Sequence, residues 1–142
     1  MRRHLLALGL AWAVAVGGLG AFAGAPIGAA IYEGLDTVVT TFTLCSVQNV
    51  ADALMETKRV LRPGGRLLFV EHGRAPDASA AAWQNRIEPV WKRIAGGCHL
   101  TRPVTRAISS AGFACDAPQG DYMKRTPKWL GWVEYGEARL AS

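Results

Sequence analysis

The chain has 142 residues, which is the length of about one domain. Half of the residues are hydrophobic and 19% are charged, and this balance excludes a wholly disordered protein. The formal net charge is +5, but Arg2 and Arg3 lie in an N-terminal stretch without acids, so the remainder has only a mild positive excess. A nucleic-acid-binding protein needs a concentrated basic face, so we expect no nucleic acid among the partners.

The N-terminal part differs in composition from the rest. Residues 4–32 contain no Lys, Arg, Asp or Glu. We therefore divide the chain into an apolar leader, residues 1–32, and a domain, residues 33–142. Three interpretations of the leader stay open. It has the layout of a secretory signal, with small residues at Ala21 and Ala23. It is long enough for a helix that spans or lies on a membrane. It could also be an apolar extension without a native packing partner, as a misplaced start codon would produce.

A strand, a helix and a second strand follow the leader. Residues 36–41 are β-branched and apolar, which is typical of a strand buried on both faces. Residues 48–61 carry apolar side chains at helical spacing, with Asn49 as the candidate N-cap. Pro63 and the glycines after it predict a turn, and residues 66–72 predict the second strand. The unit is βαβ, so the two strands should be parallel.

The second half of the domain predicts two helices and two strands. The first helix covers residues 79–94, with Ser79 as its cap and a bend at Pro89. Thr101 caps the next helix, which runs to about Ala111. Short strands are expected over residues 113–117 and 132–139. Trp83 and Trp91 lie eight residues apart in the first helix, and we expect both in the core.

The cysteines predict neither a disulfide scaffold nor a metal centre. Their number is odd, and no CxxC pair occurs among Cys45, Cys98 and Cys115. Cys45, Cys98 and His99 are scattered groups without the paired spacing of zinc ligands, so we predict no metal site. Small buried thiols, reduced in a cytosolic domain, are the expectation.

Several segments resemble the second half of class I S-adenosylmethionine (SAM) dependent methyltransferases. Residues 35–41 (LDTVVTT) and 59–65 (RVLRPGG) are similar to the small-molecule branch that includes the ubiquinone and menaquinone C-methyltransferases. The stretches LCSV (44–47), VEH (70–72) and GCHLTR (97–102) resemble more closely the group that includes membrane-associated thiol methyltransferases. Together these matches cover roughly residues 35–140.

The resemblance implies a partial, Rossmann-like α/β sheet. In the family, seven strands follow the order 3-2-1-4-5-7-6, with strand 7 antiparallel. Residues 36–41 and 66–72 would be strands 4 and 5, and the two late strands would be 6 and 7. The predicted fold is therefore a 4-5-7-6 sheet, preceded by an apolar N-terminal helix.

The family's SAM loop has no convincing counterpart here. Relatives carry an acid and a glycine-rich loop after strand 1, and an acid after strand 2 that holds the ribose. The segment before strand 4 is too short for three strands and their helices, and Gly17-Gly18-Leu19-Gly20 lacks both acids. The expectation is a truncated domain, whose ability to bind SAM alone is in question.

Four residues are candidates for the site, all at the carboxyl ends of the two parallel strands, where α/β sheets bind ligands. Thr41 matches a hydroxyl position that contacts SAM in the quinone methyltransferases, and Phe42 would lie beside the cofactor. Glu71 and His72 could orient an acceptor or remove its proton. The alternative for each is structural: a hydroxyl that satisfies a strand end, or a pair that anchors the next helix.

The leading hypothesis is methyl transfer from SAM to a small-molecule acceptor in the cytoplasm, with residues 4–32 as a candidate membrane contact. An unpaired strand over residues 36–41 would favour self-association. Two alternatives remain open. One is a non-catalytic membrane-associated or exported small protein. The other is a subunit that completes a separately encoded first half.

Overall fold

The computed structural model describes residues 34–140. The predictions for residues 1–32, including the Gly17–Gly20 motif, lie outside the described residues. Eight elements follow in chain order: β1 (Leu35–Thr41), α3 (Val50–Val60), β2 (Leu61–His72), α4 (Ala78–Ile94), α5 (Val104–Ser110), β3 (Phe113–Tyr122), α6 (Lys128–Gly131) and β4 (Trp132–Leu140). None of these helices combines the length and the hydropathy that crossing a bilayer would require.

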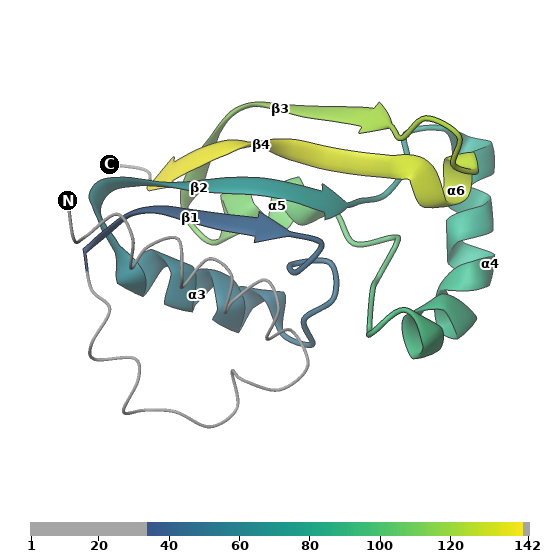
Figure 1. Cartoon of the computed structure of the whole chain (residues 1–142), viewed down its shortest axis with the longest axis horizontal. Coiled ribbons are helices and arrows are strands. Elements are labelled where there is room, and N and C mark those ends of the chain that lie inside the picture. Colours follow the sequence, from purple (N-terminus) through teal and green to yellow (C-terminus); the bar gives the residue numbers. More distant parts are fainter. Residues whose placement is uncertain (1–33, 141–142) are drawn as a thin grey trace.

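The four described strands form one mixed sheet in the order β1-β2-β4-β3 (Figure 1). β1 and β2 are parallel, with Val38 opposite Leu67. β4 runs antiparallel to both of its neighbours, β2 and β3. The predicted mixed α/β fold is confirmed for these residues, and so are the parallel first pair and the late antiparallel pair.

α3 forms the crossover between the parallel strands, and its start agrees with the prediction. The Asn49 side chain accepts hydrogen bonds from the backbone N–H groups of Ala51 (3.1 Å) and Asp52 (3.3 Å). This bonding satisfies two of the N–H groups that a helix start leaves without partners. The predicted turn at residues 62–65 is instead part of β2, which begins at Leu61. The pairing with β1 is irregular there, with a register shift between Leu35 and Thr37.

The described helices α3 and α5 cover the same face of the sheet (Figure 1). The largest buried side chains lie in this one core: Leu44, Leu54, Leu67, Phe69, Leu100 and Ile108. On the other face, Val39 and Val70 are 36% and 38% exposed. Our expectation that residues 36–41 are buried on both faces is therefore wrong for the described part of the chain, because its helices supply only one covering layer.

The second half departs from the prediction in its boundaries. α4 follows Asp77 rather than a Ser79 cap, and α5 follows Pro103 rather than beginning at Thr101. β3 extends to Tyr122, because β4 pairs with it along most of its length and a register shift between Asp116 and Gln119 absorbs the irregularity. The short helix α6 was not predicted. Within β3, turn-forming residues hide the strand signal.

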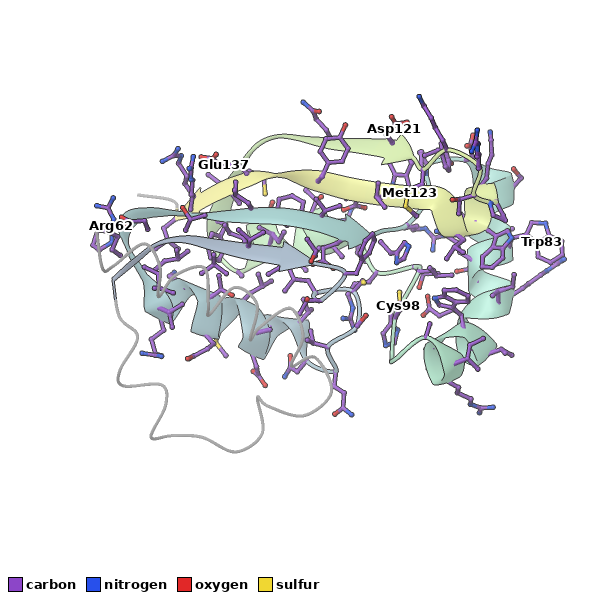
Figure 2. All side chains as sticks on the ribbon, viewed as in Figure 1. Arg62, Trp83, Cys98, Asp121, Met123 and Glu137 are labelled. Carbon is purple, nitrogen blue, oxygen red and sulfur yellow. The ribbon has the colours of Figure 1, made fainter. Side chains whose placement is uncertain are left out.

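The two tryptophans of α4 do not share an environment. Trp83 is 54% exposed and points away from the rest of the molecule (Figure 2). Trp91 is partly buried, and its ring meets Trp129 of α6 edge-on with centroids 5.8 Å apart. Eight residues turn a helix by about 80° beyond two full turns. The expected core position is therefore wrong for Trp83, while Trp91 packs against the core.

Candidate functional site

The candidate site lies at the carboxyl ends of β1 and β2. The ladder between these strands continues one residue past β1, because Phe42 N–H donates to Val70 O at 2.9 Å. Phe42 then adopts a φ of 49°, which is uncommon for a residue with a bulky side chain. The chain turns sharply here, and both Thr41 and Phe42 have exposed side chains. The two predicted cofactor-contacting residues thus lie together on an accessible edge, and their role remains a prediction.

Glu71 fixes the loop that follows this turn. Its side chain is fully buried. Oε1 accepts from Thr43 N–H and Oε2 from Cys45 N–H, each at 3.1 Å. The hydrogen bonds compensate for the cost of burying a carboxylate. Because both oxygens are engaged by backbone, the geometry favours a positioning role for Glu71, and a direct role in chemistry stays a prediction.

His72, the other candidate, ends β2 and is partly buried. Its ring lies 4.6 Å from the Phe42 ring, centroid to centroid. Nδ1 is 3.4 Å from the Sγ of Cys98. Nε2 is buried and has no hydrogen-bond partner among the described residues. A buried ring nitrogen without a partner is uncommon in folded proteins, so this atom is a natural point of contact for a bound molecule.

The structure brings together two thiols that the sequence left apart. Cys45, in the loop after β1, and Cys98, in the loop after α4, are both buried. A hydrogen bond joins their Sγ atoms, 3.7 Å apart. The hydrogen bond between the two thiols lowers the pKa of Cys98 and raises the pKa of Cys45, and burial raises the pKa of Cys45 further. The expectation that these cysteines are scattered is wrong.

The third member of this cluster is His72 and not His99. The ligand-type atoms of Cys45, His72 and Cys98 all lie within 4.8 Å of one another. His99 points elsewhere, and its Nδ1 lies 3.2 Å from Glu88 Oε1. A signal was present in the sequence: Cys45 and His72 each lie near the end of one of two parallel strands. The position of Cys98 could not be predicted in this way, because it depends on how the chain folds back after α4.

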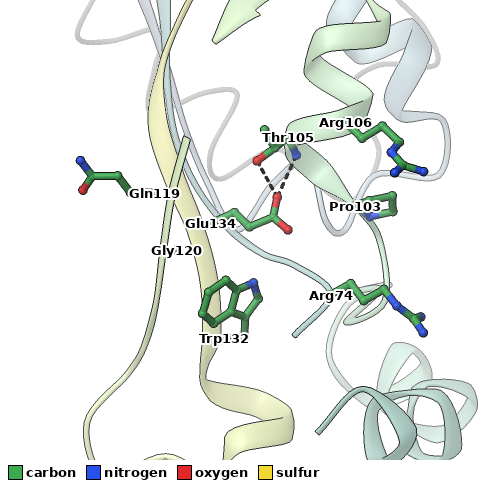
Figure 3. Close-up of a pocket in the computed structure, with 8 residues that line it drawn as sticks. All are labelled: Arg74, Pro103, Thr105, Arg106, Gln119, Gly120, Trp132 and Glu134. Atoms are coloured by element: carbon green, nitrogen blue, oxygen red, sulfur yellow. Dashed lines mark hydrogen bonds between the residues drawn. The ribbon is translucent and has the colours of Figure 1, made fainter. Parts of the chain in front are cut away.

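A pocket of about 390 Å³ lies between α5, β3 and β4 (Figure 3). Its lining residues come from segments widely separated in sequence: Arg74, Pro103, Thr105, Arg106, Gln119, Gly120, Trp132 and Glu134. Glu134 Oε2 accepts from the N–H (2.9 Å) and the hydroxyl (2.6 Å) of Thr105. Sequence reasoning did not find this pocket, because β3 was expected to end before Gln119.

A family described as "Methyltransferase domain" matches residues 32–69. The thiol S-methyltransferase TMT1B of Rattus norvegicus is 45% identical over 97 residues, which are 68% of this chain and 39% of that protein. Its Homo sapiens counterpart is 44% identical over 103 residues, 72% of this chain and 40% of that protein. The chain belongs to the class I SAM-dependent methyltransferases. It spans about two fifths of the length of these relatives.

Solved structures bear out the class I fold. A SAM-dependent methyltransferase from Methanosarcina mazei superposes with a TM-score of 0.59 at 16% identity, over 79% of this chain and 63% of that one. A methyltransferase from Bacillus halodurans gives 0.55 at 18% identity, over 84% and 66%. At such identities the likeness concerns the fold. The sequence matches confirm the predicted methyltransferase family, and this chain carries a part of the fold that the solved structures share.

Proposed function

We propose that the chain takes part in methyl transfer from SAM to a small thiol. The observation that carries this proposal is the 44–45% identity with thiol S-methyltransferases. The matched chain folds into a sheet whose carboxyl edge presents the exposed side chains of Thr41 and Phe42. A thiol is a suitable acceptor, because a few per cent of it is ionised at neutral pH and the thiolate is a strong nucleophile.

The described residues fit one part of the cofactor's surroundings. The exposed Thr41 hydroxyl and Phe42 ring can contact SAM at the edge of β1. The one acid at the ends of these two strands, Glu71, has both oxygens committed to backbone N–H groups, so it offers no free carboxylate for the ribose hydroxyls. SAM, when bound, supplies an electrophilic methyl group on a positively charged sulfur.

His72 is the residue that we propose contacts the acceptor. Its Nε2 is buried without a partner among the described residues, so a hydrogen bond to the acceptor sulfur would satisfy it. That bond would hold the sulfur in line with the methyl group, and alignment is the main requirement of a direct displacement. Glu71 acts indirectly, because it fixes the loop that carries Thr43 and Cys45.

The test uses the purified full chain with SAM and a small aliphatic thiol. Calorimetric titration measures SAM binding, and mass spectrometry measures the methyl thioether formed. We expect His72→Gln to lower the turnover rate about tenfold, the worth of one hydrogen bond. His99→Gln is the matched control, because His99 pairs with Glu88 away from the cluster. The proposal would be contradicted if the wild-type chain neither bound SAM nor formed the methyl thioether.

A further inference from the structure

Three metal-ligating atoms converge at the candidate edge from three separate segments. They are the Sγ of Cys45 after β1, the Nδ1 of His72 at the end of β2, and the Sγ of Cys98 after α4. The two sulfur atoms are 3.7 Å apart, and Nδ1 is 3.4 Å from the Cys98 sulfur. Figure 2 places Cys98 near the ends of β1 and β2.

These distances are those of a tetrahedral zinc site. Zinc lies about 2.3 Å from thiolate sulfur and about 2.0–2.1 Å from imidazole nitrogen. Tetrahedral angles then separate two sulfur ligands by about 3.8 Å, and a sulfur from a nitrogen by about 3.5 Å. The separations of 3.7 Å and 3.4 Å fall within 0.1 Å or so of both values. The third separation, between the Cys45 sulfur and His72 Nδ1, is at most 4.8 Å.

The backbone holds the cluster in place without any metal. Cys45 N–H donates to Glu71 Oε2 at 3.1 Å, and Cys45 O accepts from His99 N–H at 2.8 Å. The second bond joins the two cysteine-bearing loops directly. Arg102 Nη1 strengthens the junction, since it donates to Leu44 O (2.6 Å) and Val47 O (2.8 Å). Ligands positioned by such surrounding contacts are characteristic of built metal sites.

The donor set selects the metal. Two thiolates and one imidazole are soft-to-borderline ligands, which suit zinc and disfavour magnesium or calcium. Two ionised thiols also neutralise the charge of a divalent ion in a buried position. We propose that Cys45, His72 and Cys98 bind Zn²⁺ as a three-ligand site with its fourth position open. With Nδ1 on the metal, His72 carries its proton on Nε2, the atom that the proposed function directs at the acceptor.

The experiment is a titration of the reduced, metal-free full chain with Co²⁺, followed by displacement with Zn²⁺. We expect one equivalent to bind, with the intense near-ultraviolet absorption of cobalt–thiolate bonds. Cys98→Ser should weaken Zn²⁺ binding at least a hundredfold and remove about half of that absorption. Cys115→Ser is the matched control, because Cys115 lies on β3 and outside the cluster, and it should leave both unchanged.

A second measurement needs no substitution, so it holds even if Cys98→Ser fails to fold. X-ray absorption of the zinc-loaded wild-type chain should show two sulfur neighbours at about 2.3 Å and nitrogen or oxygen neighbours at about 2.0 Å. A shell of nitrogen and oxygen only would overturn the proposal. The proposal would also be overturned if Cys45 and Cys98 formed a disulfide and its reduction restored no metal binding. Neither readout uses methyl transfer, so failure of the zinc site and failure of the proposed function are separate results.

Discussion

The Tyr122 hydroxyl donates a 2.5 Å hydrogen bond to Asp77 Oδ2 and so ties the end of β3 to the start of α4. Lys128 Nζ lies 3.4 Å from the same oxygen and 5.4 Å from the centre of the Tyr122 ring. Lys128 belongs to α6, and it contributes charge to this contact between elements.

This contact predicts a tyrosine with an unusual titration. Burial and the hydrogen bond to the Asp77 carboxylate raise the pKa of Tyr122 to about 12. A pKa raised on folding stabilises the folded state fully below the ordinary tyrosine value near 10, and the gain is lost as pH rises through 12. Absorbance at alkaline pH measures the ionisation, and Tyr122→Phe identifies the step that belongs to this residue. Asp77→Asn should move the step to lower pH.

An ionisation of Tyr122 near pH 10 in the wild-type chain would contradict the expectation. The partner carboxyl gives an independent check at the acidic end. Hydrogen bonds from Tyr122 and Lys128 lower the pKa of Asp77. A lowered carboxyl pKa stabilises the folded state at pH values above the ordinary carboxyl pKa. This stabilisation is lost as the pH falls through the pKa that the carboxyl has in the folded state.

At the scale of elements, the end of α4 determines where Cys98 lies. Gly96 and Gly97 both adopt left-handed conformations, with φ of +61° and +87°. Gly97 N–H donates to Lys92 O at 2.8 Å, which closes the helix. A Cβ added at Gly97 would lie 2.9 Å from Ser46 O, whereas one added at Gly96 would meet nothing within 4 Å. Only glycine at 97 lets the two cysteine-bearing loops approach.

The two glycines therefore form a matched pair of substitutions. Gly96→Ala should lower the free energy of unfolding by about 1 kcal/mol, the cost of a left-handed alanine. Gly97→Ala carries that cost and a clash with backbone, so we expect a loss of about 3 kcal/mol. Urea denaturation measures both, and Co²⁺ titration should show weaker binding for Gly97→Ala. If Gly96→Ala and Gly97→Ala lowered the free energy of unfolding equally, the expected clash at residue 97 would be contradicted, because the two loops would then separate without cost.

The unit of β1, α3 and β2 could be predicted from the sequence because its signals are local. Apolar runs mark the strands, and Asn49 caps the helix with its own side chain. The cysteine cluster could not be predicted, since Cys45 and Cys98 are 53 residues apart and meet through backbone contacts between loops. The candidates Thr41, Phe42, Glu71 and His72 were found because strand ends in a parallel pair share an edge.

At the scale of the whole molecule, the described sheet has one bare face, and β1 and β3 form its two edges. β1 has β2 as its single neighbour among the strands of residues 34–140. On the bare face, the apolar side chains of Val39 and Val70 are more than one third exposed. An apolar edge strand of this kind offers unpaired backbone groups to another chain.

We therefore expect the chain to self-associate through β1, as residues 36–41 suggested from sequence. Val39→Lys places a charge on the edge strand and should shift the sedimentation coefficient towards that of the monomer at equal protein concentration. Met55→Lys is the control, because Met55 is exposed on α3, on the other side of the molecule's core. A wild-type chain that sediments as a monomer at every concentration would contradict this expectation.

The bond between His99 N–H and Cys45 O spans more than fifty residues of chain. Contacts between such distant residues close a large loop and carry a high entropic cost, so we expect them to form after α3 and after the pairing of β1 with β2. The approach of the two thiols is therefore expected to be a late step of folding. When a refolding chain first holds Cys45 and Cys98 together, the turn after β1, the end of β2 and the exit from α4 have all reached their native positions.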